Sequence, residues 1–556
     1  MEADSKNGLP LRTGSEPGAW GNGCRRRAAR AALRLRRAGT PCLAAAALVS
    51  GCVVGPDFVA PEAPTVPDPA RSYSAAPLPA RTASAPGAAG AAQEFGLGQD
   101  VPALWWQLFG SPALDELIRS ALAHSPTLAS AQAALRQSQE LYAAGSGQLY
   151  PQLSAGLKGQ RARFSAFTNP PDGGIFSLYN ASVDVSYTLD AFGATRRGLE
   201  GLQAQTDAQR FQVTATYLSL TANIVTTAIQ EASLRAQLQA THEIIASQSR
   251  ALEIVRRQAE LGAIAQQPVL AQQTQLAQTQ AGVPALEKAL GQTRHQLALL
   301  AGRLPGEGGL PEFTLDSLHL PRELPVSLPS ALVRQRPDIQ ASEALLHAAS
   351  AQVGVATANL YPQITLSASA GFIGLGLGDV FSGSSPVWSI GGQLLAPIFN
   401  GGTLQAQKRA AEAAYDQARG EYQQTVLAAF RNVADALRAI ESDAVALGAQ
   451  VHAADLARQS LELVDRQYAL GALDLLQLLD AQLAVQQTRI ALVQAQAARF
   501  ADSAALLQAL GGGWWNREPL ELSSGPAAFA SAASQPSPGV RRAPQPEARP
   551  ADTAGK

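Results

Sequence analysis

The sequence predicts a membrane protein of mixed α and β structure, built as an internal two-fold repeat, that completes a β-barrel only with further copies of itself. Three observations predict this fold. The tetrapeptide Leu-Tyr-Pro-Gln occurs at 149–152 and again at 360–363, 211 positions later. The segments after each copy alternate between apolar and polar residues, and long proline-free stretches rich in helix-forming residues follow them. The 556 residues therefore contain two equivalent units in tandem.

Composition excludes several functions. The chain has 43 basic and 44 acidic residues, a net charge of -1, so it lacks the basic surface that nucleic-acid binding requires. All three cysteines lie within the first 52 residues, so neither a disulfide framework nor a zinc site can hold the body together. The six histidines show no metal-ligand spacing, and no nucleophile-elbow or P-loop pattern occurs. The sequence therefore predicts neither an enzyme nor a nucleic-acid-binding protein.

The N-terminal segment has the layout of a secretory signal. Arginines cluster between 25 and 37, and an apolar run of small residues follows at 42–49. The run ends in Val-Ser-Gly-Cys52, which resembles a bacterial lipobox, so Cys52 is expected to carry lipid and Val53 after it to direct export to the outer membrane. The alternatives are a signal peptide with a chance cysteine and a short membrane anchor, although the run falls well below the ~20 residues of a spanning helix.

Two segments lack any hydrophobic period. Residues 60–98 are rich in Pro, Ala, Ser and Gly, as is the C-terminal tail. The expected organisation is an N-terminal extension with lipoprotein signal peptide at 1–51, a lipidated N-terminus and extended tether at 52–98, a first repeat at 99–321, a second repeat at 322–522, and a disordered tail at 523–556.

Each repeat is expected to run from a helix into a β-hairpin, a long helix and a return helix. Proline ends the first helix, because it forces the residue before it out of helical geometry. Tyr150 and Pro151, and equally Tyr361 and Pro362, therefore mark helix-to-strand junctions. The expected elements are a helix at about 127–149, a hairpin at about 151–190, a long helix at about 193–261 and a return helix at about 266–302, then the same order at about 338–360, 363–398, 402–470 and 474–510.

The strand segments explain why several copies are required. Residues 181–189 and 364–372 alternate strictly between apolar and polar types, with weaker partners near 153–164 and 386–396. Four strands leave two unpaired edges, which a bilayer cannot satisfy, and membrane barrels need at least ~8 strands. Three copies would supply about 12 strands, with apolar residues toward lipid and polar residues toward a water-filled lumen. The glycine-rich stretch 374–378 is expected to be a loop that opens no helix.

The long helices are too long for a globular core. About 69 residues at ~1.5 Å each reach on the order of 100 Å. Each should end at Leu-Gly-Ala, at 261–263 and at 470–472, where glycine suits a C-cap. In the second helix, spacings of three and four residues connect an apolar seam that is typical of helices packed side by side. The seam comprises Tyr422, Val426, Phe430, Val433, Leu437, Ile440, Ala444, Leu447 and Val451.

Together these segments resemble the outer-membrane efflux channels of tripartite pumps, of the TolC and OprM type, and particularly their NodT-like lipoprotein branch. The resemblance covers roughly 52–522. It is carried by the two Leu-Tyr-Pro-Gln copies and by the segments 52–58 (CVVGPDF), 105–109 (WWQLF), 334–339 (RQRPDI) and 510–514 (LGGGW).

The resemblance implies a fold and a set of partners. The fold is a homotrimer with a 12-stranded outer-membrane β-barrel, a 12-helix periplasmic α-barrel and an equatorial domain. The partners are a periplasmic adaptor protein and a proton-driven inner-membrane pump. No catalytic residue, metal or cofactor is implied, apart from the lipid on Cys52.

The resemblance also implies functional residues. The tips Leu261, Gly262 and Ala263, with Leu470, Gly471 and Ala472, would dock the adaptor, unless each glycine serves only its turn. Leu476 and Asp480, four residues apart on one helix face, would form an apolar and an acidic ring at the periplasmic gate. The alternative is that Leu476 packs in the helix seam and Asp480 is a solvated charge. Leu473 and Gln477 stand where some relatives carry charges, which argues against a gate-locking salt bridge.

The sequence therefore predicts a passive, gated export duct for drugs and other toxic small molecules. A structural lipoprotein, a trimeric coiled-coil spacer without transport activity, is the alternative, and it leaves the alternating hairpins unexplained. A periplasmic adaptor would need lipoyl-like segments around a single helical hairpin, which the duplicated layout does not supply.

Overall fold

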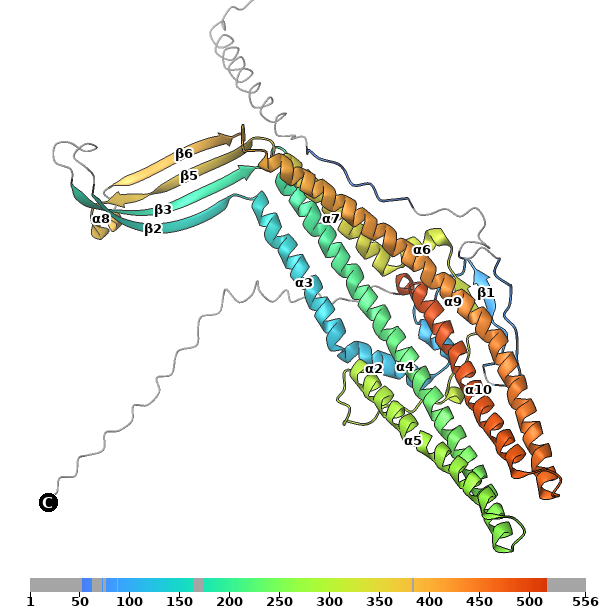
Figure 1. The fold of residues 1–556 in the computed structure, drawn as a ribbon. Helices are drawn as coiled ribbons and strands as arrows, with labels where there is room; N and C mark the ends of the chain where they lie inside the picture. Colours follow the sequence, from blue (N-terminus) through green and yellow to red (C-terminus); the bar gives the residue numbers. More distant parts are fainter. Residues whose placement is uncertain are drawn as a thin grey trace, which may run out of the picture.

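The computed structural model describes residues 53–62, 73, 77–87, 89–163, 174–382 and 385–517. The signal segment, Cys52 and the tail 523–556 lie outside the described residues. The molecule is elongated, with a curved sheet at one end, two helical hairpin tips at the other and a helical layer between them (Figure 1). Among the described helices, none is both long and apolar enough to cross a membrane.

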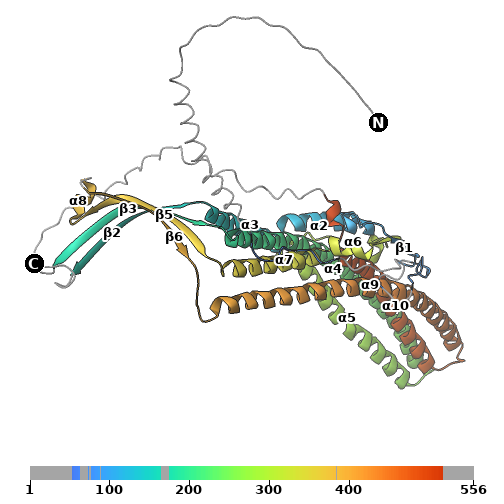
Figure 2. The ribbon, with the colours of Figure 1, turned by 90° about the horizontal axis from the view of Figure 1, so that it is seen from above.

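The sheet combines one hairpin from each repeat. Its strands are β2 (Gln152–Arg163), β3 (Ile175–Leu189), β5 (Gln363–Gly374) and β6 (Pro386–Leu395), all antiparallel and in this spatial order. The four strands predicted from period-two alternation are thus confirmed. β3 and β5 join the hairpins at the centre, and β2 and β6 are the edges, as Figure 2 shows from above.

The register of the sheet produces alternating polar and apolar rows. Since side chains of successive rows point to opposite faces, one face is polar and the other apolar. On the polar face, the Ser182 hydroxyl donates a hydrogen bond to Asp184 Oδ2 over 2.8 Å. One polar row runs Ser154–Asp184–Ser369–Ser389, and the next row, which is apolar, runs Leu153–Val185–Ala368–Ile390.

Six helices form the elongated layer. Pro126 and Pro337 begin two of them, where the missing N–H costs no helical hydrogen bond. The Ser125 hydroxyl also accepts a hydrogen bond from the Leu128 N–H over 3.3 Å. The helices are α3 (Pro126–Ser146), α4 (Ala194–Glu260), α5 (Gln266–Leu300), α7 (Pro337–Ala358), α9 (Thr403–Ala469) and α10 (Leu475–Ala509).

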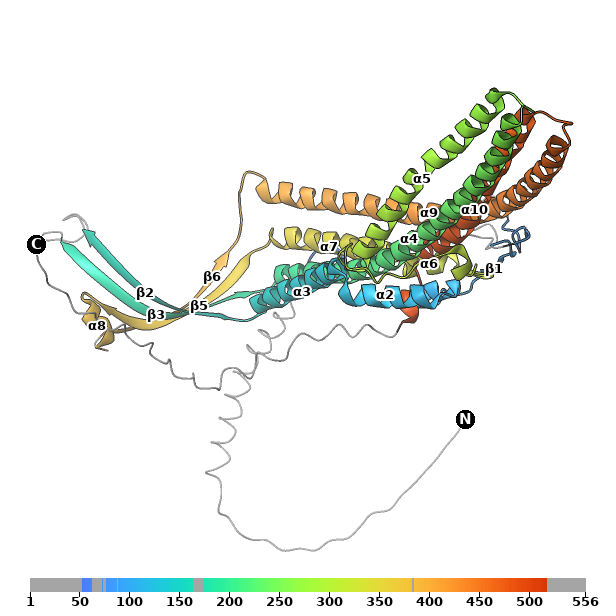
Figure 3. The same ribbon diagram turned by 90° about the horizontal axis from the view of Figure 1, so that it is seen from below.

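The helices lie in four adjacent rows. α4 packs against α3 and α5 on one flank and against α7 and α10 on the other, and α9 covers the far flank of α7 and α10 (Figure 3). α7 and α10 meet end to end. At their junction, Arg336 Nη1 at the start of α7 donates a hydrogen bond to the Ala509 carbonyl over 2.8 Å. Each repeat thus contributes two rows.

The predicted seam of α9 is confirmed over most of its length. Tyr422, Val426, Val433, Leu437, Ile440, Ala444 and Leu447 are buried, while Phe430 packs partly against the core. This seam faces α7 and α10 and closes the layer on that flank.

The small elements at the middle of the molecule were not predicted from the sequence. These are β1 (Glu94–Leu97), η2 (Trp105–Phe109), α2 (Pro112–His124), η4 (Leu315–Ser317), β4 (Glu323–Val326) and α6 (Pro329–Gln335), with β1 and β4 paired in parallel. Their core contains the fully buried aromatic residues Trp105, Trp106 and Phe109.

The expectation that 52–98 form an extended tether is wrong for its second half. Fully buried Gln93 donates through Nε2 to Ser503 Oγ and to the Pro321 carbonyl, both over 2.9 Å. Buried Arg499 on α10 donates to Gln93 Oε1 over 2.7 Å and to the carbonyl of Ala91 over 3.2 Å. Polar contacts with distant residues hold this segment, so it needs no apolar period of its own.

The expectation of a loop without a helix at 374–378 is also wrong. The five-residue helix α8 (Leu377–Phe381) begins there, with Gly376 as its N-cap residue. The Asp379 side chain accepts a hydrogen bond from the Gly376 N–H over 2.8 Å and stabilises this turn.

Candidate functional site: hairpin tips and membrane junctions

The first tip is a left-handed glycine turn. Leu261 ends α4, and Gly262 follows with a φ of +74°. The N–H of Gly262 bonds the Ala259 carbonyl over 3.0 Å, and that of Ala263 bonds the Gln258 carbonyl over 2.9 Å. This pair of bonds is a Schellman motif, which satisfies the last carbonyls of the helix.

The second tip repeats this geometry and adds a cap. Gly471 has a φ of +73°, and the Ala472 N–H bonds the Gln467 carbonyl over 2.9 Å. Asp474 then caps α10, since its Oδ1 accepts from the Gln477 N–H over 3.2 Å. The returning helix α5 begins after Ala265 without a side-chain cap.

Both tips expose their leucines. Leu261 is 70% exposed and Leu470 is 84% exposed. Beneath them an apolar cluster joins the two hairpins, and we call it the tip cluster. It consists of Leu252, Val255, Val269, Leu475 and Leu478.

The two candidate gate residues lie on the open face of α10. Leu476 is 64% exposed and Asp480 is exposed as well. Leu475 and Leu478 occupy the seam instead, so Leu476 does not pack in the seam of its own chain. No ion pair involves Asp480 in the part of the chain that the structure describes. Both side chains are therefore free to face other copies or water.

The two helix-to-strand junctions lie directly before the strands β2 and β5. Tyr150, directly before Pro151, has extended backbone (φ −113°, ψ 153°), and β2 begins at Gln152. Tyr361, directly before Pro362, stacks on Phe192 with ring centroids 4.8 Å apart. Phe192 lies between β3 and α4, so this stack joins the two repeats at the level where strands become helices.

A charged clamp that could not be predicted from the sequence lies beside these junctions. Arg197, only 5% exposed, bonds Asp57 Oδ1 through Nη2 over 2.6 Å and Glu200 Oε2 through Nη1 over 2.7 Å. His347 Nε2 lies 2.8 Å from Glu200 Oε1, and its ring stacks on Phe58 at 4.4 Å. These partners come from three distant segments, so no spacing rule could have grouped them.

The electrostatics of the clamp favour the ionised carboxylate. Burial alone would raise the pKa of Glu200, but the hydrogen bonds from Arg197 and His347 outweigh it and lower that pKa. The clamp holds residues 54–58 against α4 and α7 as a charged network. The N-terminal segment is thereby fixed at the height of the junctions, where the Val54 N–H also bonds the Phe192 carbonyl over 3.2 Å.

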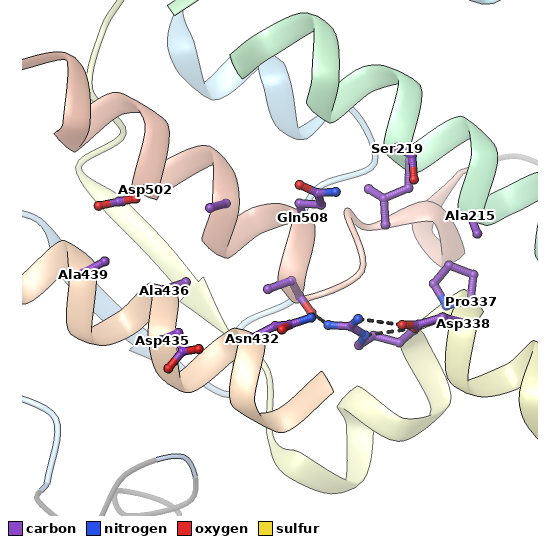
Figure 4. A pocket seen from close by; sticks show the side chains of 14 residues that line it. Ala215, Ser219, Pro337, Asp338, Asn432, Asp435, Ala436, Ala439, Asp502 and Gln508 are labelled. Atoms are coloured by element: carbon purple, nitrogen blue, oxygen red, sulfur yellow. Dashed lines mark hydrogen bonds and ion pairs between the residues drawn. The ribbon is translucent and has the colours of Figure 1, made fainter. Parts of the chain in front are cut away.

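A cavity lies where α10 ends and α7 begins. It has a volume of 560 Å³ and is lined by α4, α9, α10 and the start of α7. Arg336 lines it, and the Oδ2 of Asp338, labelled in Figure 4, pairs with the guanidinium over 2.6 Å. Asp435 from α9 and Asp502 from α10 also line the cavity. Its wall is therefore acidic overall.

Asp502 faces a second carboxylate. Burial is the main reason why the pKa of Asp502 rises to about 7, and the hydrogen bond and charge of Asp443 on α9 raise it further. Asp502 is thus partly protonated at neutral pH. Nothing in the sequence marks this pair, since 59 positions separate the two residues.

Comparisons with known proteins place the chain in a family. The model of the family described as "Outer membrane efflux protein" matches residues 117–303 and 328–512. The chain is 30% identical over 478 residues to the antibiotic efflux pump outer membrane protein ArpC of Pseudomonas putida, which covers 84% of this chain and 94% of ArpC. It is 33% identical over 420 residues to the pyoverdine export outer membrane protein OpmQ of Pseudomonas aeruginosa, covering 74% and 87%.

Solved structures of outer-membrane proteins are similar in fold to this chain. The outer-membrane channel OprN superimposes with a TM-score of 0.75 at 27% identity, covering 83% of this chain and 100% of OprN. The outer membrane protein VceC of Vibrio cholerae gives a TM-score of 0.69 at 26% identity, covering 74% and 100%. These matches confirm the predicted resemblance, the outer-membrane location and the role in efflux: the chain belongs to the outer membrane efflux protein family.

Proposed function

We propose that three copies of this chain form one passive, gated duct, which receives small molecules from an inner-membrane pump through a periplasmic adaptor. The observation that carries this proposal is the four-stranded sheet, which has a polar face, an apolar face and two unpaired edges. Such a sheet is stable neither in water nor in lipid until its edge strands are hydrogen-bonded to other strands. The remaining features of the chain support the same assembly.

The edge strands have the side chains of a lipid-facing surface. Leu157 on β2 is 60% exposed, and Trp388 and Ile390 on β6 are 76% and 79% exposed. If β6 of one copy pairs with β2 of the next, all backbone groups of the edges are satisfied. Three copies give about 12 strands, which enclose a water-filled lumen lined by the Ser and Asp rows.

The helical layer has open flanks as well. The outer face of α9 carries the exposed residues Leu427, Val445, Leu456 and Leu463. We infer that α3 and α5 of a neighbouring copy cover this face. Four helical rows from each of three copies then make the 12-helix periplasmic tunnel, with the β1–β4 region around its middle as the equatorial domain.

The tips are the proposed gate and docking surface. Leu476 and Asp480 would each form a ring of three around the axis, the first limiting water and the second favouring cations. Residues 261–263 and 470–472 are exposed and would contact the adaptor. We propose lipidation at Cys52, and no other cofactor, because the partner pump, proton-driven in this proposal, supplies the energy.

Single-channel recording tests this function. Full-length lipidated protein in a planar bilayer should give discrete, cation-selective openings. Asp480→Asn should lower the ratio of cation to anion permeability, and Leu476→Ala should raise the mean conductance severalfold. If neither the wild type nor the protein with both substitutions shows discrete openings, the spacer lipoprotein is the better account.

A further inference from the structure

The apolar core of the helical layer is interrupted before it reaches the tips. On α4 the main core ends at Ala232, with Ala236 packed partly against it, and the tip cluster begins at Leu252. The stretch 237–251 between them spans roughly 22 Å of helix. The tip cluster is therefore an apolar island, separate from the core that holds the middle of the molecule.

Buried polar residues predominate in the interruption, alongside the buried apolar Ala240 and Ile244. On α4, Gln237, Thr241 and Gln248 are 8%, 3% and 1% exposed. Facing them are Gln272 on α5, which is fully buried, and Gln482 on α10, which is 7% exposed. We call this layer the polar belt. It comprises the buried residues Gln237, Thr241, Gln248, Gln272, Thr279 and Gln482, with the half-buried Gln486 and the exposed Gln494 at its edge.

The hydrogen bonds that cross the polar belt are long. Gln272 Nε2 donates to Gln482 Oε1 over 3.4 Å, and Gln494 Nε2 donates to Gln237 Oε1 over 3.3 Å. The Thr279 hydroxyl lies 3.5 Å from Gln486 Oε1. A good N–H···O bond is about 2.9 Å long, so these bonds are weak. A cross-helix ion pair nearby, Arg489 with Glu243, is half exposed and adds little.

Two glutamines in the polar belt have unmet hydrogen-bonding groups. Within the described part of the chain, neither side-chain polar atom of Gln248 has a protein partner, nor does Gln272 Oε1. Burying an amide without a partner is unfavourable, and water would remove the penalty. The arrangement with the two hairpins packed together is thus stabilised at the tip cluster and destabilised at the polar belt.

We propose that the polar belt is the hinge at which the two hairpin tips separate, with water pairing the amides of Gln248 and Gln272 in the open state. This inference rests on the proposed gated duct. A change of state needs an interaction that differs between the states, and hydration of these amides provides it. The tip cluster holds the hairpins closed until the adaptor or pump shifts the balance.

Replacing a buried amide by an apolar group of similar length tests the hinge. Gln248→Met in the full-length, lipidated protein should lower the open probability in planar bilayers about tenfold, because the closed state loses its unmet groups. Gln278→Met, at an exposed position of α5, is the matched control and should leave the open probability unchanged. Hydrogen–deuterium exchange over 252–262 should slow in Gln248→Met alone.

Two results would overturn the hinge. One is an open probability and an exchange rate that Gln248→Met leaves at wild-type values; the other is an equal change in both variants. If Gln248→Met does not assemble, Gln272→Met takes its place with the same expectation. Wild-type protein that forms no channel would refute the duct itself, whereas a gating wild type with unaffected belt variants would refute only the hinge.

Discussion

At the scale of single residues, the candidate functional groups differ in whether the sequence could identify them. Leu476 and Asp480 could be chosen from the sequence because their spacing places them on one helix face, and the structure leaves both exposed. Asp443, Asp502, Arg197 and Arg499 could not be chosen. Each acts through partners that are distant in sequence, and a periodic pattern records only which side of a helix is buried.

The Asp443–Asp502 pair predicts a pH dependence of stability. The pKa of Asp502 rises from 3.8 to about 7 on folding, mainly through burial. Below about pH 4, Asp502 is protonated in both the folded and the unfolded chain, so its raised pKa costs no stability. Between pH 4 and pH 7 the unfolded chain releases the proton first, so stability falls as pH rises and the penalty is complete above pH 7.

Asp502→Asn should therefore stabilise the assembled protein at pH 8 and change little at pH 4. We expect about 1–2 kcal/mol at pH 8, because solvent screens a half-buried pair. Thermal unfolding followed by circular dichroism across this pH range measures the effect. Asp443→Asn should give a smaller stabilisation in the same pH range, since it removes the neighbouring carboxyl group but leaves Asp502 buried. A stabilisation that does not vary with pH would contradict the raised pKa of Asp502.

At the scale of elements, the hydrophobic period and the positions of the prolines were sufficient to locate the long strands and helices. Strict alternation located the strands of the sheet, and proline-free stretches located α4 and α9. The short elements β1, β4, α6 and α8 were missed, because each is too short to show a period. Long-range hydrogen bonds, such as those from Gln93 and Arg499, hold this region of the chain, and no local pattern encodes them.

The tip glycines give a prediction at this scale. Gly471 has a φ of +73°, and a Cβ there would meet no atom within 4 Å. Gly471→Ala should therefore cost only backbone strain, about 1 kcal/mol, and should speed hydrogen exchange at the end of α9. Gly448→Ala, in the interior of α9 and also free of contacts, should stabilise the helix by about 0.5–1 kcal/mol. If both substitutions changed the stability in the same direction, the tip would not depend on the left-handed turn.

At the scale of the whole molecule, the central feature is a sheet that one chain cannot close. The alternation of rows could be predicted from the sequence, and so could the need for partners, because four strands are too few for a barrel. The pairing of the copies involves contacts between chains, about which the sequence of one chain says little. Leu153 on β2 and Ile390 on β6 lie in one row at opposite edges, three strand spacings or roughly 14 Å apart.

Cross-linking between these edges in outer membranes tests the account most directly. With Leu153→Cys and Ile390→Cys in one chain, a thiol reagent of roughly 8 Å is too short to bridge the edges of a single sheet. The account predicts covalent products that end at three linked copies. Monomers alone, over a series of reagent lengths below 14 Å, would contradict a barrel shared between chains.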